Sequence, residues 1–403
     1  MSQDPSAEHF FRHEYGRLVA SLVRRFGVSH VAAVEDAAQD ALLSALDTWP
    51  RVGAPKNPAA WLYRVAHNAL LDGLRKQTRH GRLLANAALA PSPNPPAEDP
   101  DRDLLRMLFL CCHDALTPEL QCAFALKTLV GFSVEEIAVR LIAQPATIHK
   151  RLQRARQRLR ARADSLDALE ADDYERRMPA VHRVLYMIFT EGYLSSDADL
   201  AIRAELCDEA IRLTALLARL DHPETAALLA LMHLNGARIA GRRDHDDALL
   251  LLAEQDRTRW DHEQIHSGLR WLARSAEGDA FSRYHAEAGI AAQHCIAESL
   301  ETTRWDTIAD LYHLWESIEP SPMHRLNRAL AVAEGRGPAP ALALLADTEF
   351  PVWIQDTYQW HAVFADLYRR SGQAARAGHH AAEALARAPS DPIRALLARR
   401  FGV

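Results

Sequence analysis

Apolar side chains recur every three or four residues along almost the whole chain, and this helical period is the feature that most restricts its fold. No convincing run alternates polar with β-branched residues, as a strand with one buried face would. Ala, Leu, Arg and Glu, which all favour helices, fill the periodic segments. The sequence therefore predicts an all-α protein, and its 403 residues suffice for two or three domains.

Two stretches interrupt the helical period and mark domain boundaries. The segment PSPNPPAEDP, residues 91–100, holds five Pro in ten residues, which excludes a regular helix or sheet and indicates an extended tether. A softer, acidic boundary lies at residues 164–173. We expect a helical domain, a Pro-rich linker, a second helical domain, an acidic linker and a C-terminal helical domain at residues 8–90, 91–103, 104–163, 164–178 and 179–403.

Charge is divided unevenly along the chain. The formal net charge is −6, which by itself argues against a nucleic-acid partner. Residues 1–163, however, hold 22 Lys and Arg against 16 Asp and Glu, whereas the remainder holds 25 against 37. The whole-chain charge therefore conceals a basic front of +6 and an acidic back of −12.

The N-terminus and the cysteines indicate the compartment. The first ten residues, MSQDPSAEHF, are polar and acidic, unlike a signal peptide, and no apolar run approaches the length of a membrane span. The five cysteines form no C-x-x-C pair, which argues against a zinc ribbon or a thioredoxin-like motif. Cys111, Cys112 and Cys122 lie in apolar helical sequence and are expected in the core. We therefore expect a protein of the reducing cytoplasm, without a membrane partner.

The sharpest local pattern is GFSVEEIAVRLIAQPATIH followed by KRLQRARQRLRAR, residues 131–162. It predicts an apolar helix, a break at residues 142–144, and a second helix that begins with Pro145, whose missing N–H is not needed in a first turn. The last thirteen residues carry seven positive charges and no negative one. One stripe of the second helix is formed by Thr147, Lys150, Arg151, Arg154 and Arg158. A helix–turn–helix with such a stripe suits the major groove of DNA; the alternative is a solvated charged helix.

The first 90 residues are expected to form three or four helices, two of which carry polar faces. An amphipathic helix is expected over residues 10–26, and EDAAQDALLSALDTW, residues 35–49, places two acids and an amide on one face. A loop with one Gly and two Pro is expected over Arg51–Ala60, before a helix over Trp61–Lys76. The polar residues are Asp36, Gln39 and Asp40 on the earlier helix, and Asn68, Asp72, Arg75 and Lys76 on the later one.

Together these patterns resemble a known family. EDAAQDALLSALDTW and WLYRVAHNALLDGLRK are similar to the second conserved region of bacterial sigma factors, and GFSVEEIAVRLIAQPATIHKRLQRARQRLR is similar to the fourth. Both occur in the right order within residues 8–163, joined by a flexible linker, with no room for the intervening region of larger sigma factors. This is the layout of the extracytoplasmic-function (ECF) group. The resemblance implies two small helical domains and a sigma factor that directs promoter-specific transcription initiation, with neither catalysis nor a cofactor of its own.

The resemblance also implies partners. Core RNA polymerase would be bound through its β′ clamp helices and its β flap, and promoter DNA at the −35 and −10 elements. The face implied to dock on the β′ clamp helices consists of Asp36, Gln39 and Asp40. Two acids and an amide on one stripe suit a basic partner, although a solvated helix face has the same appearance.

Residues implied to meet DNA lie in three segments. The loop Arg51–Ala60 corresponds to the segment that captures a flipped base of the −10 element, and it departs from the family in being Pro-rich and lacking aromatics. Residues implied at this element are Arg51, Lys56, Asn57, Asn68, Asp72, Arg75 and Lys76. Residues implied at the −35 element are Thr147, His149, Lys150, Arg151, Gln153, Arg154 and Arg158. Within the basic run, the residues best suited to neutralise phosphates are Arg151, Arg156, Arg158 and Arg160.

The C-terminal part is longer than a minimal ECF factor requires. Near its end, seven residues stand at the spacing of a tetratricopeptide helix–turn–helix, which needs neighbouring repeats to bury its apolar face. They are Ala365, Tyr368, Gly372, Ala377, Ala384, Leu385 and Pro389. Weaker helical pairs fit residues 204–234, 286–318 and 326–345, and residues 189–217 and 251–261 resemble the tetratricopeptide-like extension of one ECF group. We expect this domain to regulate the factor through a protein or ligand that the sequence does not identify.

Two other interpretations remain open. Residues 262–266, HEQIH, are a literal HExxH, which could bind zinc in a peptidase. With 20 His in the chain a chance match is common, and Leu269 and Leu272 stand where the extended motif has Gly and a third His; Glu287 is a distant candidate ligand. The other interpretation is a DNA-binding regulator with a repeat-based partner-binding domain, which would not need the Asp36, Gln39 and Asp40 face. We expect no bound metal.

Overall fold

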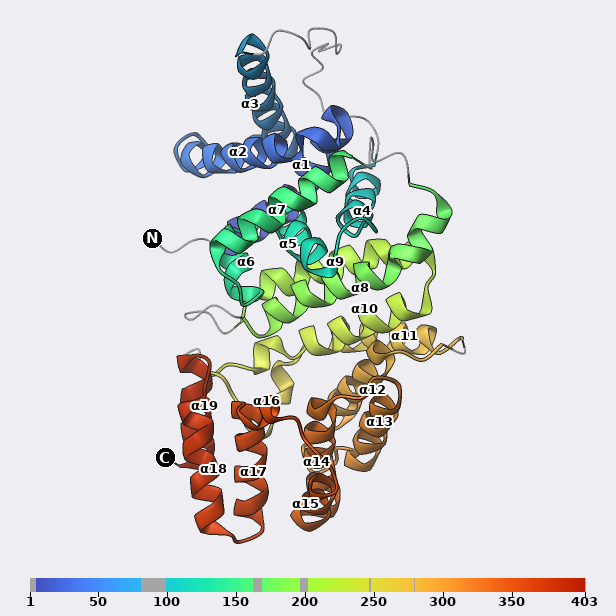
Figure 1. Ribbon diagram of the computed structural model, residues 1–403, viewed down its shortest axis with the longest axis vertical. Helices are drawn as coiled ribbons and strands as arrows, with labels where there is room; N and C mark the ends of the chain where they lie inside the picture. The colour runs from blue at the N-terminus through green and yellow to red at the C-terminus, as the bar shows by residue number, and fades with distance from the viewer. Residues whose placement is uncertain are drawn as a thin grey trace. The chain divides into compact units, whose positions relative to one another are not determined.

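The computed structural model describes residues 5–80, 99–161, 169–195, 202–245, 248–278 and 280–402. These residues are predominantly helical and contain no strand, apart from an isolated bridge between Arg243 and Leu249 (Figure 1). This confirms the predicted all-α fold. The chain forms two compact units, Met1–Ile188 and Phe189–Val403.

Unit 1 begins with three long helices. They are α1 (Pro5–Phe26), α2 (Val31–Val52) and α3 (Pro58–His80), with a single 3-10 turn, η1 (Val28–His30), before α2. The side chains of Leu22, Val34 and Leu62 are almost fully buried among them. Helix α2 passes through Pro50 and ends at Val52, and the N–H of the next residue, Gly53, donates to the Trp49 carbonyl at 2.9 Å. The loop to α3 is therefore residues 53–57 rather than the predicted 51–60, because a proline in the last turn removes one hydrogen bond without ending the helix.

Five shorter elements follow in unit 1. They are α4 (Pro100–Cys111), α5 (Pro118–Ala125), the π-helical turn η2 (Leu126–Val130), α6 (Val134–Arg140) and α7 (Pro145–Arg160). Helices α4, α5 and α7 each begin with proline, where no hydrogen bond is lost. Phe109, Phe124 and Phe132 fill the core between these elements. Cys111 and Cys112 are fully buried, as predicted, whereas Cys122 is half-buried.

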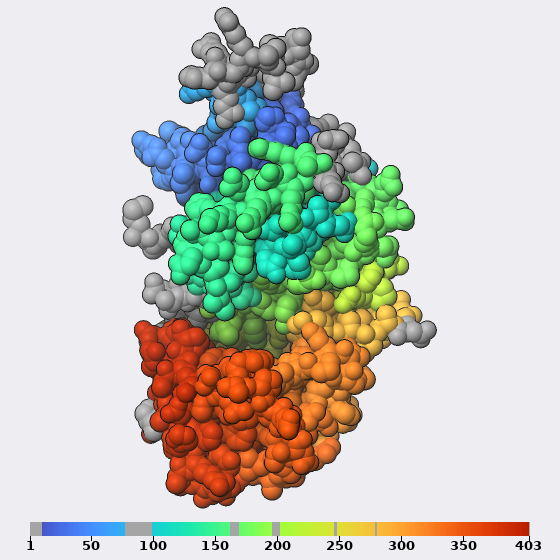
Figure 2. Space-filling view, viewed as in Figure 1, coloured from blue at the N-terminus to red at the C-terminus, as the bar shows by residue number. Residues whose placement is uncertain are grey.

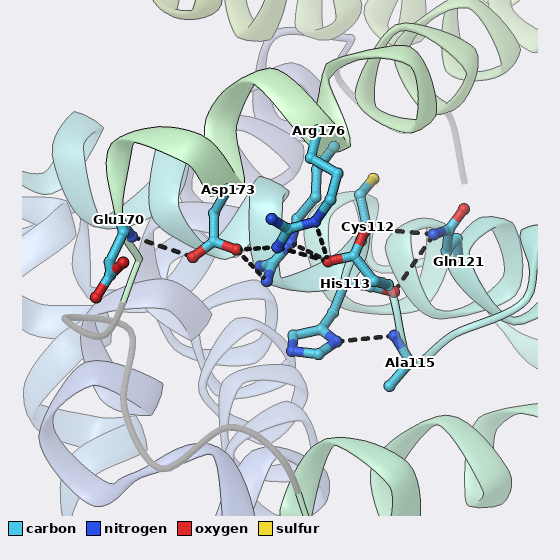
Figure 3. A network of polar contacts seen from close by, with 9 residues as sticks. Cys112, His113, Ala115, Gln121, Glu170, Asp173 and Arg176 are labelled. Carbon is cyan, nitrogen blue, oxygen red and sulfur yellow. Dashed lines mark hydrogen bonds and ion pairs between the residues drawn. The ribbon is translucent and has the colours of Figure 1, made fainter.

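Two predicted linkers overlap helices. Residues 91–98 lie outside the described residues, but α4 already begins at Pro100. Helix α8 (Ala171–Tyr193) begins inside the predicted acidic linker, of which residues 164–168 lie outside the described residues. Arg177 Nε of α8 donates to Asp114 Oδ2 at 3.1 Å, and Arg177 Nη2 donates to Asp173 Oδ1 at 2.9 Å. Arg176, which Figure 3 labels, bonds to the same two carboxylates, so the network ties α8 to the turn after α4. The first part of α8 therefore belongs to unit 1, and the chain passes into unit 2 only after Ile188.

Unit 2 consists of helical pairs. Its longer helices are α9 (Ala204–Leu217), α10 (Pro223–Gly236), α11 (His262–Ser275), α12 (Arg283–Ile296), α13 (Trp305–Ile318), α14 (Pro322–Arg336), α15 (Pro338–Ala346), α17 (Tyr358–Arg370), α18 (Ala374–Ala386) and α19 (Asp391–Phe401), with the single turn α16 (Val352–Gln355) between α15 and α17. The three weaker pairs expected from the sequence correspond to α9 with α10, α12 with α13, and α14 with α15.

The spacing at residues 365–389 also yields a helical hairpin. Ala365 in α17 and Ala384 in α18 are buried at 1% and 0% exposure, so the small residues lie inside the packed unit. Gly372 lies between the two helices with φ +74°, a left-handed conformation that favours glycine. A cluster of apolar side chains runs from α12 to α17, and a second joins α17, α18 and α19 with Ile202 and Leu249. A tetratricopeptide-like arrangement of these pairs stays a prediction.

Candidate nucleic-acid interface

Helices α6 and α7 form the predicted helix–turn–helix. Ser133 and Glu136 cap α6 reciprocally: the Glu136 N–H donates to Ser133 Oγ at 3.1 Å, and the Ser133 N–H donates to Glu136 Oε2 at 2.7 Å. The turn spans residues 141–144, close to the predicted break. Ile142 in this turn has φ +47° and is 96% exposed. A β-branched residue is strained in that conformation, so the turn geometry is maintained by the helices on either side of it.

Helix α7 divides into a buried side and an exposed side. Ile148, Leu152, Ala155 and Leu159, at the helical period, are buried at no more than 3% exposure. The opposite side forms part of the surface seen in Figure 2. We call its exposed residues the outer stripe: Thr147, His149, Lys150, Gln153 and Arg154. Because the buried side fixes the rotation of the helix, these side chains can reach a groove together without a change in α7.

The remaining arginines of α7 are placed differently. Arg151 is half-buried, and Arg158, although exposed, donates through Nη1 to the Ala115 carbonyl at 3.1 Å. Arg156 forms an ion pair with Glu35 of α2, and Arg160 Nε donates to the Ser29 carbonyl of η1 at 3.0 Å. Some side chains of the basic run therefore face only solvent, whereas others bond to the rest of unit 1.

The face of α2 that was predicted to dock on polymerase is accessible. Asp36 and Asp40 are exposed and Gln39 is half-buried. On the following turns of α2, Leu43 and Leu46 are 63% and 52% exposed. Exposed apolar side chains next to two exposed acids are typical of a surface that a protein partner covers.

Two residues of the segment predicted to meet the −10 element are held by local hydrogen bonds. Arg51 belongs to α2, where its Nε donates to the Asp47 carbonyl at 2.8 Å and its guanidinium also pairs with the Asp47 carboxylate. Asn57 Oδ1 accepts from the Ala60 N–H at 3.0 Å at the start of α3. In the loop itself, Lys56 is exposed.

The polar side that the sequence predicts for α3 is exposed. Its members are Asn68, Asp72, Arg75 and Lys76. Asp72 and Arg75 form an ion pair at 3.5 Å, a weak contact between two exposed side chains. These four side chains lie on one helix after the loop, as the sequence predicts.

Sequence reasoning missed the polar residues buried inside unit 1. Glu35 lies on the apolar side of α2 and is 0% exposed; it accepts from Thr128 Oγ1 at 2.5 Å, in addition to its ion pair with Arg156. Burial raises the pKa of the Glu35 carboxyl, and Arg156 and Thr128 offset part of that effect. The signal was present in the periodicity, since Glu35 is four residues after Val31 and three before Ala38, both of which are apolar and buried.

The HExxH pattern does not assemble a metal site in the part of the chain that the structure describes. Residues 262–266 open α11, with His262, Glu263 and His266 exposed. Glu287, the distant candidate ligand, accepts from Arg283 Nε at 3.2 Å. Among the described residues no group of three or more His, Cys, Asp or Glu side chains could hold a metal ion. Within the same residues, no helix is both long and apolar enough to cross a membrane.

Comparisons with known proteins match three parts of the chain. Residues 11–80 match the family described as Sigma-70 region 2, and residues 106–159 match Sigma-70, region 4. Residues 177–276 match a family of unknown function (DUF6596). An uncharacterized protein of Rhizobium meliloti (strain 1021) is 35% identical over 369 residues, which are 89% of this chain and 86% of that protein. No solved structure matches the chain.

A helix–turn–helix with an outward basic stripe, preceded by helices with an accessible acidic face, defines a DNA-binding transcription protein. Within that class, the chain belongs to the sigma-70 family, as an ECF-like sigma factor for transcription initiation with a C-terminal extension. Sigma-factor families are not enzymes, and their partners are RNA polymerase and promoter DNA.

Proposed function

We propose that this sigma factor binds core RNA polymerase through α2 and reads the −35 element through α7. The polymerase surface consists of Asp36, Gln39 and Asp40, extended by the exposed Leu43 and Leu46. The β′ clamp helices are its proposed partner, because an acidic and apolar face complements a basic helical surface. The β flap would contact the region 4 helices α4–α7.

The single observation that carries the DNA assignment is the outer stripe. Lys150 and Arg154 can donate to guanine O6 and N7, and Gln153 can pair with adenine, each good pair giving ~1–3 kcal/mol of discrimination. Thr147 and His149 complete the reading surface. Arg151 and Arg158 are the proposed phosphate contacts that orient the helix without reading sequence.

The proposed −10 surface is smaller than the sequence implied. Lys56 in the loop and the exposed side of α3, with Asn68, Asp72, Arg75 and Lys76, would meet the melted strand or its phosphates. Arg51 and Asn57 would act mainly by shaping the loop, because Arg51 is bonded to Asp47 and Asn57 to the start of α3. The loop lacks aromatic side chains, so stacking on a flipped base is not part of the proposal.

For the C-terminal extension we propose a regulatory role exerted through a bound protein or ligand. The support is its construction from helical pairs, which is how repeat domains build extended binding surfaces.

Run-off transcription with purified core polymerase and a promoter library tests the proposal. We expect transcripts that depend on this protein and that share sequence upstream of their start sites at both elements. Transcription that is independent of the protein, together with tight binding to DNA alone, would instead support a DNA-binding regulator that never engages polymerase as a sigma factor.

A further inference from the structure

Unit 1 contains a set of polar contacts between its first three helices and its later ones, which we call the latch. At its centre the carboxylate of Glu35, on α2, accepts from Thr128 Oγ1 of η2 at 2.5 Å and pairs with Arg156 of α7. The Glu35 side chain is 0% exposed, whereas Arg156 retains 24% exposure. These partners are 93 and 121 residues away from Glu35 in the sequence, so the contact joins the first helices of unit 1 to its later ones.

Two further ion pairs cross the same boundary. Arg24 Nη1 of α1 lies 3.0 Å from Asp103 Oδ1 of α4, and the Asp103 side chain is fully buried. Arg17 Nη2 of α1 lies 2.7 Å from Asp101 Oδ1, with both side chains only partly exposed. Three carboxylates and three arginines therefore hold the region 2 helices α1 and α2 to the region 4 helices.

The backbone in the latch is packed as closely as glycine permits. A Cβ atom on Gly16 of α1 would lie 2.7 Å from the Leu129 carbonyl oxygen of η2, a distance that no side chain can adopt. Tyr15, 2% exposed, packs against Gly131 at the end of η2. This contact is as close as those inside a single domain, so it is a specific arrangement of the two parts.

The latch occupies arginines that DNA would otherwise attract. Arg156 and Arg160 lie on the same helix as the outer stripe, but their guanidinium groups are bonded to Glu35 and to the Ser29 carbonyl. Guanidinium binds carboxylate and phosphate in the same way, through charge-assisted N–H···O bonds. A groove of about 470 Å³ lined by Ala32, Gln153, Arg156, Gln157 and Arg160 gives an anion access to both arginines.

The closed arrangement is also too short for a promoter. The −35 and −10 elements are roughly 25 base pairs apart, as the positions in their names indicate. This separation is on the order of 85 Å of B-form DNA at about 3.4 Å per base pair. A compact globule of about 190 residues has a radius of gyration of about 16 Å and thus a diameter of about 40 Å. While the latch is closed, α3 and α7 cannot reach both elements of straight DNA.

The latch can open because its central ion pair is expensive to bury. Desolvation raises the pKa of Glu35 despite the two hydrogen-bond partners, so the carboxylate is less stable there than in water. Buried ion pairs of this kind fix one arrangement without adding much net stability. Opening rehydrates Glu35 and releases Arg156 together.

We propose that Glu35 acts as an internal substitute for a DNA phosphate, holding Arg156 in a closed state of unit 1 that must open before both promoter elements are read. This inference rests on the proposed function for the identity of the DNA, but the contacts that define the closed state are independent of it.

The Glu35→Gln variant tests the latch, because the amide retains the side-chain volume and a hydrogen bond to Thr128 while losing the charge that holds Arg156. The probe is a short DNA duplex of arbitrary sequence, since phosphate contacts do not depend on sequence. With Arg156 released, we expect the affinity to rise roughly five- to tenfold and the salt dependence to steepen by about one unit of slope. Glu175→Gln, which removes one negative charge from an exposed side chain of α8 and leaves every latch contact in place, is the matched control and should leave the slope unchanged.

A charge exchange at the second ion pair gives an independent result, even if Glu35→Gln fails to fold. Arg17→Asp and Asp101→Arg should each raise duplex affinity, and the double variant, which restores the pair with reversed polarity, should return to the wild-type value. Asp101→Arg also gains affinity from its own positive charge, so the decisive result is a rise in Arg17→Asp, which adds negative charge and can gain affinity only through opening. If Arg17→Asp and Asp101→Arg bind the duplex as wild type does, or if the double variant fails to restore the wild-type affinity, the latch does not exist.

Amide hydrogen exchange separates this inference from the proposed function. In Glu35→Gln, the amides of Leu126–Val130 should exchange faster in the absence of DNA and polymerase, because η2 loses its partner helix on opening. Unchanged exchange there, with normal promoter-directed transcription, would overturn the latch alone. Faster exchange in Glu35→Gln, together with no promoter-directed transcription by the wild-type protein, would overturn the proposed function and support the latch.

Discussion

The outer stripe of α7 and the arginines behind it have similar composition but different surroundings. Lys150 and Arg154 project from the exposed side, whereas Arg156 and Arg160, on the next turns of the same helix, are bonded to Glu35 and to the Ser29 carbonyl. A run of positive charge therefore does not reveal which cations are available to DNA. Availability depends on where a carboxylate some 120 residues earlier in the chain is placed, and only the folded structure reveals that.

The largest expected effect is on polymerase binding. Reversing charge at Asp36 and Asp40 together, to Arg, should abolish co-purification with core RNA polymerase, because two attractive contacts become repulsive. Both side chains are exposed, so stability should change by no more than roughly 0.5 kcal/mol per site, as circular dichroism can check. The control reverses two exposed acids of unit 2, Glu263 and Asp310, and should retain binding. Wild-type affinity in the Asp36/Asp40 variant would show that α2 does not dock on polymerase.

The next effect concerns the outer stripe. Lys150→Ala or Arg154→Ala should reduce promoter-specific transcription at least tenfold, since each lost base contact costs ~1–3 kcal/mol. Gln157→Ala, an equally exposed change on the same helix but outside the stripe, should have little effect. Arg158→Ala should weaken binding to all sequences and reduce the salt slope by about one. Equal losses in the Gln157 and Arg154 variants would remove the distinction between the two sides of α7.

The buried side of α7 should respond in stability rather than in recognition. Leu152, 3% exposed, packs into the core of the region 4 helices, so Leu152→Ala should lower the free energy of unfolding by about 2–4 kcal/mol. Arg154→Ala, two residues further along, should leave it within about 0.5 kcal/mol of wild type. Thermal or urea unfolding monitored by circular dichroism measures both. If the two variants unfold alike, α7 is not oriented as described.

The smallest expected effect lies in the turn before α7. Ile142 adopts φ +47° and is almost fully exposed, so Ile142→Gly removes strain without losing a packed side chain. We expect a gain of about 1 kcal/mol in the free energy of unfolding, with unchanged promoter choice. Ala143→Gly, at the neighbouring position without a positive φ, should not stabilise the protein. A loss of transcription in Ile142→Gly with intact folding would instead assign Ile142 a contact with DNA or polymerase.

The sequence predicted most helices because their apolar residues recur at the helical period, and prolines and glycines mark their ends. The same period placed Thr147, Lys150 and Arg154 on the exposed side of α7, but the predicted stripe also contained Arg151, which is half-buried. The predicted loop Arg51–Ala60 proved too long, because Pro50 lies in the last turn of α2 rather than beyond it. Local patterns could not reveal this, since a proline near the C-terminal end of a helix removes one hydrogen bond and leaves the later one, from the Gly53 N–H to the Trp49 carbonyl, in place.

The latch could not be predicted from either segment alone. In the sequence, Glu35 is one more acid beside Asp36, and Thr128 is one polar residue in an apolar segment. Only the periodicity of α2 indicates that Glu35 faces inward, and it does not name a partner. The partner is determined by the packing of α1 against η2, which depends on a glycine at position 16.

The most direct test of the assignment of α7 to the −35 element is a double-mutant cycle, which combines a protein variant with a promoter variant. Initiation by purified core polymerase is measured for wild type and Arg154→Ala, on a promoter with its −35 element intact and on one with that element replaced. We predict non-additive losses: Arg154→Ala should cost at least tenfold on the intact promoter and close to nothing on the altered one, because the contact is already absent there. Equal, additive losses on both templates would contradict the assignment of α7 to the −35 element.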